Sequence, residues 1–505
     1  MAQNSIRIRF LSSLITNFFK MGVSFLAGII IAKQLGPGGY GAYNFLLGSF
    51  SALANLLDVG TSGAFFTFIS ARTRSSRFFV YYILWVAFQL LVLLLIIFLL
   101  PDNLALKIWL GYKKELIVLA CLSSFSLNQI WRLTGQIGES IAETVEVQVR
   151  NFLASLLYLI GISMMLRFNF INLKSLFIFS AILYFAISFL YGWKLYFQQS
   201  FFNSKKEDFN TILTEFGQFC LPLVPFTLIE FVHSFLDNWL LQRLGGAVQQ
   251  GYYAVGARFS SFALIATNSI LMIFWREVAR EYEVKNIEKV RQLYFQACRS
   301  LYFFSSVIGF SLLPFSKLIV STLLGPSYED SWLVLCLMFL FPLHQCLGRI
   351  GSSMLLALHK TQTAANIGII FTLISMATTY FFMAPKSAQL PGLGLGALGF
   401  AWKMLLCQII ETSLKMIYIA KYIRSRFDVL HQIYLPIILC TTAFSIKSGI
   451  NLLGLFSASI SLGIIVFGLL YTLFTIALIY YFPSIIGINQ EKLKSILLRF
   501  QIYKK

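Results

Sequence analysis

The chain has 505 residues, of which 58% are hydrophobic and only 12% charged, and its mean hydropathy is +0.77. A soluble domain carries about a quarter of its residues as charges, so this composition excludes an ordinary soluble enzyme. The formal net charge is +20. No stretch between the apolar runs is long enough to form the basic domain that nucleic-acid binding requires, so we expect contact with anionic lipid headgroups instead.

Long apolar runs follow one another along almost the whole chain. A run of about 20 apolar residues crosses the hydrocarbon core as a helix, because only a helix or a closed barrel satisfies its own backbone there. The sequence lacks the strand alternation of a barrel. It predicts an all-α polytopic membrane protein with about fourteen transmembrane helices, at residues 10–34, 43–70, 78–100, 115–138, 146–166, 171–193, 215–242, 252–275, 299–323, 331–358, 363–384, 395–420, 431–450 and 456–482.

Basic residues between the runs predict the orientation. With fourteen spans both termini lie on one side, and within the bounds given above the loops and ends on that side hold 22 Lys and Arg against 6 on the other. The positive-inside rule therefore places both termini in the cytoplasm. The seven cysteines lie in or beside apolar runs and form no C-x-x-C pair, so we expect neither a metal site nor a disulfide framework.

One motif occurs twice, about 210 residues apart. Residues 33–36 (KQLG) and 41–43 (GAY) correspond to residues 242–245 (QRLG) and 251–254 (GYYA). Halves repeated at this spacing each have room for six spans, as in many secondary transporters. We predict two six-helix halves at residues 1–205 and 206–426, then two extra helices and a basic cytoplasmic tail at residues 427–505. The two motifs should form equivalent external turns, related by a pseudo-twofold axis along the membrane normal.

Charged side chains inside the spans are the first candidates for function, because a charge at the bilayer centre costs roughly 2.5–3.5 kcal/mol. Lys20 and Lys403 lie too deep to snorkel easily, so we expect them to face a wet cavity. Snorkelling or a structural ion pair is the alternative for each charge, above all for Arg132 and Lys415 near the cytoplasmic end. The candidate substrate-binding residues are Lys20, Asp58, Arg132, Arg258, Arg349 and Lys403.

The seventh span contains a polar triplet after two prolines. Glu230, His233 and Asp237 are spaced i, i+3 and i+7, which places them on one helical face. Two carboxylates and an imidazole can bind a cation or exchange protons. The alternative is an ion-paired seam against Arg258 or Lys403. We predict a coupling site for H⁺ or Na⁺ and no other cofactor.

Several motifs, in order along nearly the whole chain, resemble those of one family. The sequence is similar to the Wzx-type polysaccharide flippases of the multidrug/oligosaccharidyl-lipid/polysaccharide (MOP) exporter superfamily. Lys33 stands where this family usually has arginine before the first Leu-Gly. The motifs that carry the resemblance are residues 32–37 and 40–43, Asp58-Val59-Gly60, Asp237, residues 244–245 and 251–254 with Arg258, residues 324–331 (LGPSYEDS) and residues 396–401 (GALGFA).

The resemblance implies a fold and a function. It implies two six-helix bundles in a V that opens alternately to either side of a bacterial cytoplasmic membrane, with two extra C-terminal helices. Such proteins are not enzymes; they translocate an undecaprenyl-diphosphate-linked oligosaccharide. Lys20 and Arg258 match positions where related flippases keep cavity basic residues, and Asp237 lies near a cation site of peptidoglycan-precursor flippases. The implied partners are the lipid-linked oligosaccharide, membrane lipids and other polysaccharide-assembly proteins, and we expect a monomer that binds no nucleic acid.

Two other functions remain open on the sequence. A multidrug or organic-cation antiporter of the same superfamily would share the fold, although such exporters usually have twelve spans. A membrane polysaccharide-assembly enzyme, either a polymerase or an acyltransferase, is the alternative from another class. The spacing of His233 and Asp237 matches a short acyltransferase-type motif, but the sequence has no large external loop of a polymerase. The deep charges number five basic and four acidic, so the sign of the cavity depends on which of them face it.

Overall fold

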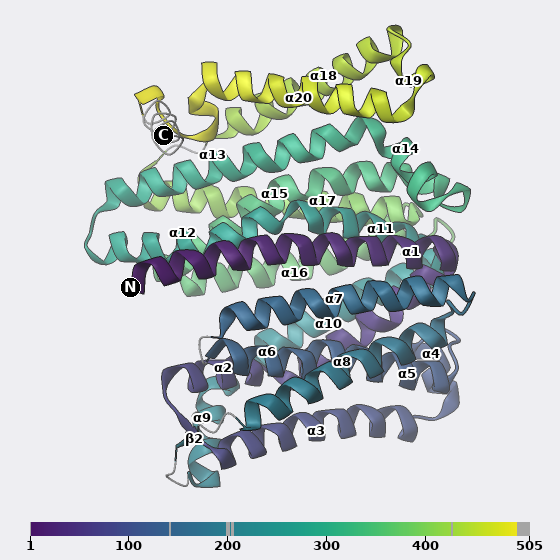
Figure 1. Cartoon of the computed structure of the whole chain (residues 1–505), viewed down its shortest axis with the longest axis vertical. Coiled ribbons are helices and arrows are strands. Elements are labelled where there is room, and N and C mark those ends of the chain that lie inside the picture. The colour runs from purple at the N-terminus through teal and green to yellow at the C-terminus, as the bar shows by residue number, and fades with distance from the viewer. Residues whose placement is uncertain (1, 141–142, 198–201, 204–206, 426–427, 492–505) are drawn as a thin grey trace. The chain divides into compact units, whose positions relative to one another are not determined.

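The structure is a computed structural model. It describes residues 2–140, 143–197, 202–203, 207–425 and 428–491, so the predicted basic tail lies outside the described residues. Of the described residues 88% are helical, and Figure 1 shows the helices along the chain. The α-helices are α1 (Ala2–Asp58), α2 (Thr61–Ala71), α3 (Ser76–Leu99), α4 (Asp102–Ile108), α5 (Lys114–Phe125), α6 (Trp131–Ser140), α7 (Thr144–Arg167), α8 (Leu173–Phe197), α9 (Phe209–Cys220), α10 (Val224–Leu240), α11 (Gly246–Ala263), α12 (Ile265–Glu283), α13 (Ile287–Leu312), α14 (Ser316–Ile319), α15 (Trp332–Ala357), α16 (Thr361–Met383), α17 (Gly396–Tyr422), α18 (Val429–Leu452), α19 (Leu455–Ala458) and α20 (Ile460–Tyr481).

Short π- and 3₁₀-helices join several of these elements. The π-helices are η1 (Ser126–Ile130), η4 (Leu241–Gly245) and η6 (Val320–Leu324). The 3₁₀-helices are η3 (Leu221–Leu223), η5 (Leu313–Phe315), η7 (Pro326–Ser331) and η8 (Pro483–Ile486). Two strands of two residues each, β1 (Arg74–Ser75) and β2 (Phe202–Asn203), pair in parallel.

The predicted polytopic helical fold is confirmed. Eleven helices among the described residues are long and apolar enough to cross a membrane. Two of them, of 43 and 53 residues, are interrupted by non-helical backbone at Gly36 and Gly246, so each supplies two spans. Helix α17 is long enough for a further span, but Lys403, Glu411 and Lys415 reduce its hydropathy. These elements together account for the predicted fourteen spans.

The two repeated turns share one backbone conformation. Gly36 has φ 66° and ψ 174°, and Gly246 has φ 80° and ψ 172°. This region of φ/ψ space is essentially restricted to glycine. A third chain reversal, at Gly325, has φ 93° and ψ 179° and lies in the third Leu-Gly motif. Glycine is therefore required at all three reversals by the backbone itself.

The repeat has a spacing of 210 residues, with one correction to the predicted alignment. The sequence pairs Leu35-Gly36 with Leu244-Gly245, whereas the structure makes Gly246 the counterpart of Gly36. The π-helix η4 precedes Gly246, and a π-turn takes up one more residue than an α-turn. At a spacing of 210 residues Lys33 corresponds to Arg243 and not to Gln242.

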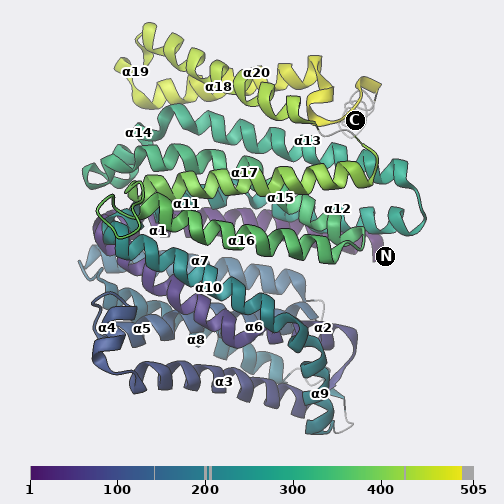
Figure 2. The same cartoon turned by 180° about the vertical axis from the view of Figure 1, so that it is seen from behind.

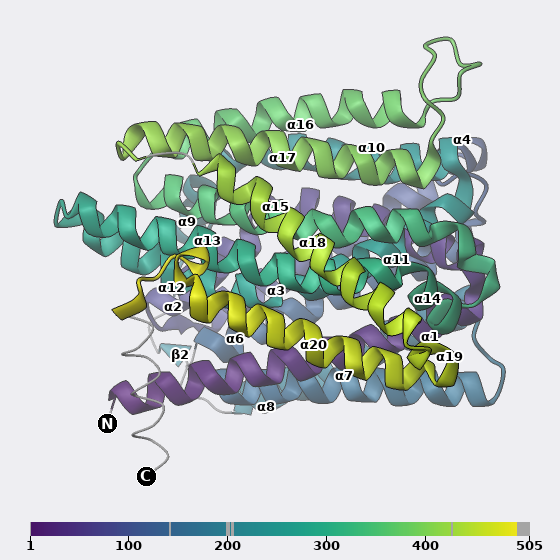
Figure 3. The same ribbon diagram turned by 90° about the horizontal axis from the view of Figure 1, so that it is seen from above.

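The chain forms two compact units. Unit 1 comprises Met1–Ala254 with Met376–Ala397, and unit 2 comprises Val255–Ser375 with Leu398–Lys505. In unit 1, α1 packs against α5, α7 and α10, and α5 packs against α3 and α8 (Figure 2). In unit 2, α13 packs against α12, α15 and α18, and the two C-terminal spans α18 and α20 run beside each other and meet at α19 (Figure 3). The predicted division into bundles at residues 205 and 426 stays a prediction.

A buried arginine fastens the connection between α8 and α9 to the start of α3. Arg74 is 3% exposed, and its guanidinium lies over the rings of Phe68 and Phe78, 5.3 and 4.5 Å from their centroids. It bonds Glu207 at 2.9 Å and also Glu215. Partial burial by itself would raise the pKa of the Glu207 carboxyl. The hydrogen bonds from Arg74 and Ser75 outweigh that effect and hold this pKa below its ordinary value.

Alanine at either turn glycine should destabilise the protein through the backbone alone. A Cβ at Gly36 or Gly246 would meet no atom within 4 Å, so only conformational strain is added. We expect each substitution to lower the free energy of unfolding by about 1–3 kcal/mol. Gly22→Ala is the matched control, because this helical glycine also has open space around it. Thermal unfolding in detergent would be measured by fluorescence-detected size-exclusion chromatography. Equal unfolding temperatures for all three variants would contradict the proposed strain.

Removing Arg74 should destabilise the protein far more than removing its exposed neighbour Arg72. Arg74→Ala leaves Glu207 without its cation and Glu215 with Arg72 alone, and we expect a loss near the lower end of about 3–5 kcal/mol because both carboxylates are partly exposed. Arg72→Ala, at 58% side-chain exposure, should cost at most about 1 kcal/mol.

The difference between the Arg74→Ala variant and the wild type should depend on pH. Because the pKa of Glu207 is lowered in the folded state, its contribution is present above the ordinary carboxyl pKa of 4.5 and is lost as the pH falls through the folded value. Thermal unfolding measured from pH 7 to pH 4 should show the two proteins converging in acid. A gap that stays constant over this range would contradict the ion-pair origin of the stabilisation.

Candidate functional site

Asp237 forms the centre of a small buried polar site in unit 1. Its side chain lies on α10 and is 7% exposed. Oδ1 accepts a hydrogen bond of 2.7 Å from the Thr379 hydroxyl on α16. Oδ2 lies 3.3 Å from Nε2 of His233, one helical turn earlier. The structure therefore brings together two of the three residues predicted for coupling, and adds a threonine that the sequence pattern did not indicate.

The backbone before this site is interrupted at its two prolines. The 3₁₀-helix η3 contains Pro222 and separates α9 from α10, and Pro225 lies in the first turn of α10. Proline is tolerated in a first turn because the N–H group that it lacks would have no helical acceptor there. The carboxylate of Asp237 thus lies on a helix that starts afresh within the span.

Glu230 lies apart from this site. It is on the same helical face, but seven residues correspond to about 10 Å along the axis, and the side chain is exposed. Among the described residues no group of three or more His, Cys, Asp or Glu side chains could hold a metal ion. A cation at Asp237 would therefore need hydroxyl, carbonyl or water oxygens as its other ligands.

Asp58 and Arg132 are paired with each other. The Asp58 carboxylate accepts hydrogen bonds from the Thr61 hydroxyl at 2.9 Å and from the Ser62 amide and hydroxyl at 3.1 and 2.6 Å. These bonds cap the first turn of α2, where Gly60 has a left-handed conformation. Arg132 lies 3.4 Å from the same carboxylate. This local ion pair is the alternative that the sequence left open for Arg132.

Of the other basic candidates, Lys20 is in unit 1. It is half-buried on α1 and interacts electrostatically with Glu139 at the end of α6. Among the described side chains it forms no hydrogen bond or ion pair. A second arginine that the sequence analysis did not single out, Arg150, is buried nearby between the rings of Trp131 and Tyr191, with Cζ 4.5 and 3.9 Å from their centroids.

The remaining basic candidates are in unit 2. Arg258 on α11 and Arg349 on α15 are half-buried. Lys403 on α17 is fully buried, with Nζ 4.9 Å from the centroid of Phe400, so it does not face open water in this conformation. The expected wet surroundings of Lys403 are therefore not seen, because ring and helix atoms enclose its side chain.

Lys415, for which the sequence favours a structural ion pair, forms one. Its Nζ lies 2.5 Å from the Glu411 carboxylate, one turn earlier on α17. It also donates a hydrogen bond of 3.0 Å to the Ser352 hydroxyl on α15. With each charge matched locally, these two residues stabilise the packing of α17 against α15.

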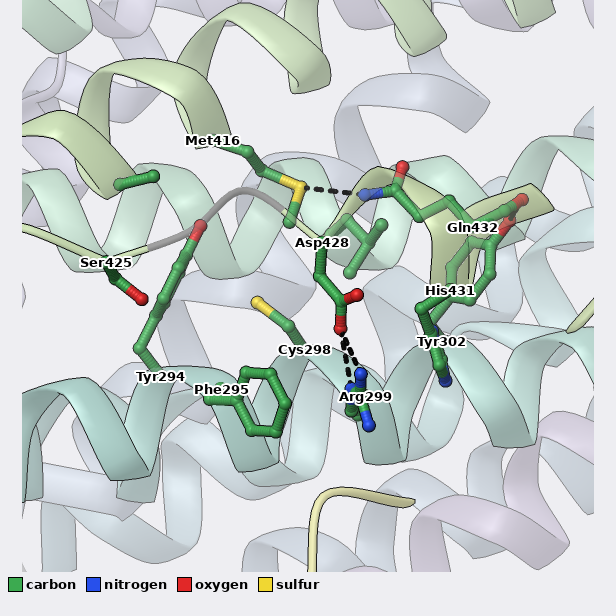
Figure 4. A pocket seen from close by; sticks show the side chains of 12 residues that line it. Tyr294, Phe295, Cys298, Arg299, Tyr302, Met416, Ser425, Asp428, His431 and Gln432 are labelled. Atoms are coloured by element: carbon green, nitrogen blue, oxygen red, sulfur yellow. Dashed lines mark hydrogen bonds and ion pairs between the residues drawn. The ribbon is translucent and has the colours of Figure 1, made fainter. Parts of the chain in front are cut away.

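A pocket of unit 2 lies where α13, α17 and α18 approach one another (Figure 4). Its cavity volume is about 30 Å³, which is room for little more than one water molecule. On one wall the Arg299 guanidinium donates to Asp428 at 2.6 Å. On the other, the Gln432 amide approaches the Met416 sulfur at 3.7 Å. Because the Arg299 charge is already neutralised by Asp428, this wall holds no spare cation for an anionic ligand.

Comparison with known proteins gives matches at the level of structure alone. No protein-family model matches the chain, and no curated protein sequence does. The lipid II flippase MurJ in an inward closed conformation superposes with a TM-score of 0.67 at 16% identity, over 92% of this chain and 99% of MurJ.

Two further solved structures are similar over somewhat less of the chain. An inward-facing multidrug resistance MATE family transporter of the MOP superfamily has a TM-score of 0.61 at 16% identity, over 80% of this chain and 94% of its own. A MOP superfamily transporter from Pyrococcus furiosus, described as having a binding pocket of reverse polarity, has a TM-score of 0.59 at 15% identity, over 82% and 95%. The chain therefore has the multi-pass helical fold of MOP superfamily transporters.

Proposed function

We propose that this protein is a flippase that moves a diphosphate-linked, lipid-anchored oligosaccharide across the cytoplasmic membrane by alternating access. What carries the proposal is the extent of the structural match. MurJ, named as a lipid II flippase, corresponds to 92% of the chain, whereas the MATE transporter corresponds to 80%. The larger coverage accommodates a chain of fourteen spans, including α18 and α20, which an exporter of twelve spans would leave unmatched.

The charge of the candidate residues supports an anionic substrate. A diphosphate needs cationic partners in a water-filled path, while its polyprenyl tail can stay in lipid. Lys20 is a deep cation without a hydrogen-bonded or ion-paired partner among the described side chains. We assign the diphosphate to Lys20 and Arg258. Arg132 is a weaker candidate, since Asp58 already neutralises it.

Reconstitution separates the proposed function from its alternatives. Purified protein in vesicles would be given a fluorescent undecaprenyl-diphosphate oligosaccharide, and the label reaching the opposite leaflet would be measured. A parallel set of vesicles would receive a lipophilic organic cation. We expect movement of the lipid-linked sugar without chemical change, whereas cation export alone would favour an antiporter and product formation would favour an enzyme.

The Asp237 site should couple transport to an ion gradient. Asp237→Asn removes the charge that a proton or sodium ion would neutralise, so we expect gradient-driven transport to fall at least ten-fold while substrate binding and folding are retained. Glu230→Gln is the matched control, because it removes an exposed carboxylate from the same helix. Transport by both variants would be measured across a range of pH and sodium. Equal rates for Asp237→Asn and wild type would make Asp237 a structural residue.

The two proposed phosphate ligands should differ in what they tolerate. Arginine binds phosphate through a planar two-donor fork, whereas lysine acts as a point charge. Arg258→Lys should therefore lower polymer export strongly and Lys20→Arg only mildly, while alanine at either position should nearly abolish it. Complementation of a flippase-null strain at matched expression is the assay, with the exposed Arg72→Ala as control. Full rescue by both alanine variants would show that neither residue binds the diphosphate.

A further inference from the structure

The two repeated turns touch each other through main-chain atoms. A Cβ built on Gly41 would lie 1.8 Å from the carbonyl oxygen of Ala247, and a Cβ built on Gly251 would lie 2.0 Å from that of Pro37. Each glycine therefore directs a Cα hydrogen at a carbonyl oxygen of the other turn, as in the Cα–H···O contacts of closely packed helices. Any larger residue would force the two turns apart.

The two contacts are equivalent under the 210-residue repeat. Adding 210 to Gly41 gives Gly251, and adding 210 to Pro37 gives Ala247, so each turn offers the same glycine and the same carbonyl position to the other. Such reciprocity is what a twofold axis produces, since residue i meets j and j meets i. The turns are thus equivalent about a local twofold axis, and both contacts lie within unit 1. That the turns are external and that the axis runs along the membrane normal stays a prediction.

We infer that these four residues, Pro37, Gly41, Ala247 and Gly251, form a releasable seal that closes the turn end of the transport path and parts once in each cycle. The inference rests on the proposed transport function. The seal lies at helix ends, so separating it breaks no helix. Each Cα–H···O contact is worth about 0.5–1 kcal/mol. Both contacts would break together when one repeat rotates away from its equivalent, which makes the closure two-state rather than gradual.

The seal is attached to the helix that holds the Asp237 site. The Gln250 side chain, next to Gly251, donates a hydrogen bond of 3.1 Å to the Asn238 side-chain oxygen. Asn238 adjoins Asp237, and its amide lies over Gly48, where a Cβ would be 3.2 Å from the amide nitrogen. Movement of the second turn away from the first would therefore displace the helix segment that holds the ion site.

Cross-linking tests whether the seal must open. Gly38 and Val248 flank it, with a Cβ at Gly38 lying 3.8 Å from Cγ2 of Val248, so cysteines at both positions can be joined by a disulfide or a short linker. We expect the joined Gly38→Cys/Val248→Cys protein to lose at least 90% of its transport and to regain it on reduction. Each single-cysteine variant under the same treatment is the control. Unchanged transport by the joined protein would show that the seal stays closed and would overturn the inference.

A distance measurement tests the seal without any transported substrate. Lys33 and Arg243 are equivalent, exposed positions on the two turns, and spin labels on Lys33→Cys/Arg243→Cys would report the separation of the turns. We expect two distance populations whose ratio responds to pH or sodium. When Gly38→Cys and Val248→Cys are also present and cross-linked, only the shorter distance should be populated. One fixed distance under all conditions would overturn the seal. Two populations in a protein that fails to move the lipid-linked sugar would refute the proposed substrate but keep the seal.

A wedge gives a third, independent readout. Gly41→Ala places a methyl group on the Ala247 carbonyl, so the seal cannot close and the longer distance between the Lys33 and Arg243 labels should become dominant. Gly63→Ala, which meets nothing within 4 Å, should leave the populations unchanged. A short distance retained in the Gly41→Ala protein would show that the main-chain contact does not determine closure.

Discussion

The arrangement of the described chain depends on a backbone conformation that only glycine adopts readily. At Gly36, Gly246 and Gly325 the positive φ with an extended ψ reverses an apolar helix within one residue. Because the reversal is this abrupt, consecutive spans lie side by side with almost no loop between them. The same short turn leaves the next helix free to start at once, which places Gly41 and Gly251 in the first turns after the reversals. Their contact with the opposite carbonyls follows from that placement.

Electrostatics divides the charges of the spans into two kinds. Asp58 pairs with Arg132 on another helix, and Glu411 pairs with Lys415 one turn later on α17, so the two charges of each pair neutralise each other at little net cost. Lys20 is different, since within the described chain it has a distant electrostatic neighbour but no hydrogen bond or ion pair. A cation left in this way is expensive in a membrane unless water or a substrate reaches it. This contrast, rather than depth alone, makes Lys20 the stronger candidate for an anionic substrate.

The sequence predicts most of the fold because its two strongest signals are local: apolar runs as long as the bilayer is thick, and glycines at the reversals. It misplaces the second turn by one residue, since nothing in residues 241–245 announces a π-turn. The candidate site is less predictable, because its residues meet only after folding. Thr379 lies 142 residues from Asp237, and helical periodicity cannot find such a partner. Helical periodicity also assigns Glu230 to the site, because it gives a residue's angle around the helix axis but not its distance along that axis.

The connection between Asp237 and the repeated turns gives the repeat a role beyond symmetry. An ion at Asp237 changes the charge next to Asn238, and Asn238 is hydrogen-bonded to Gln250 beside Gly251. Gln249, the residue before Gln250 on the same helix, accepts a hydrogen bond of 2.8 Å from the Ala397 amide at the start of α17. The first turn of α11 thus connects the Asp237 site, the seal and the start of α17. A main-chain contact of small energy suits this position, because an ion can bias it with only a few kcal/mol of differential binding. A closure made of large interlocking side chains at the same place would need more differential binding free energy than one ion site can supply.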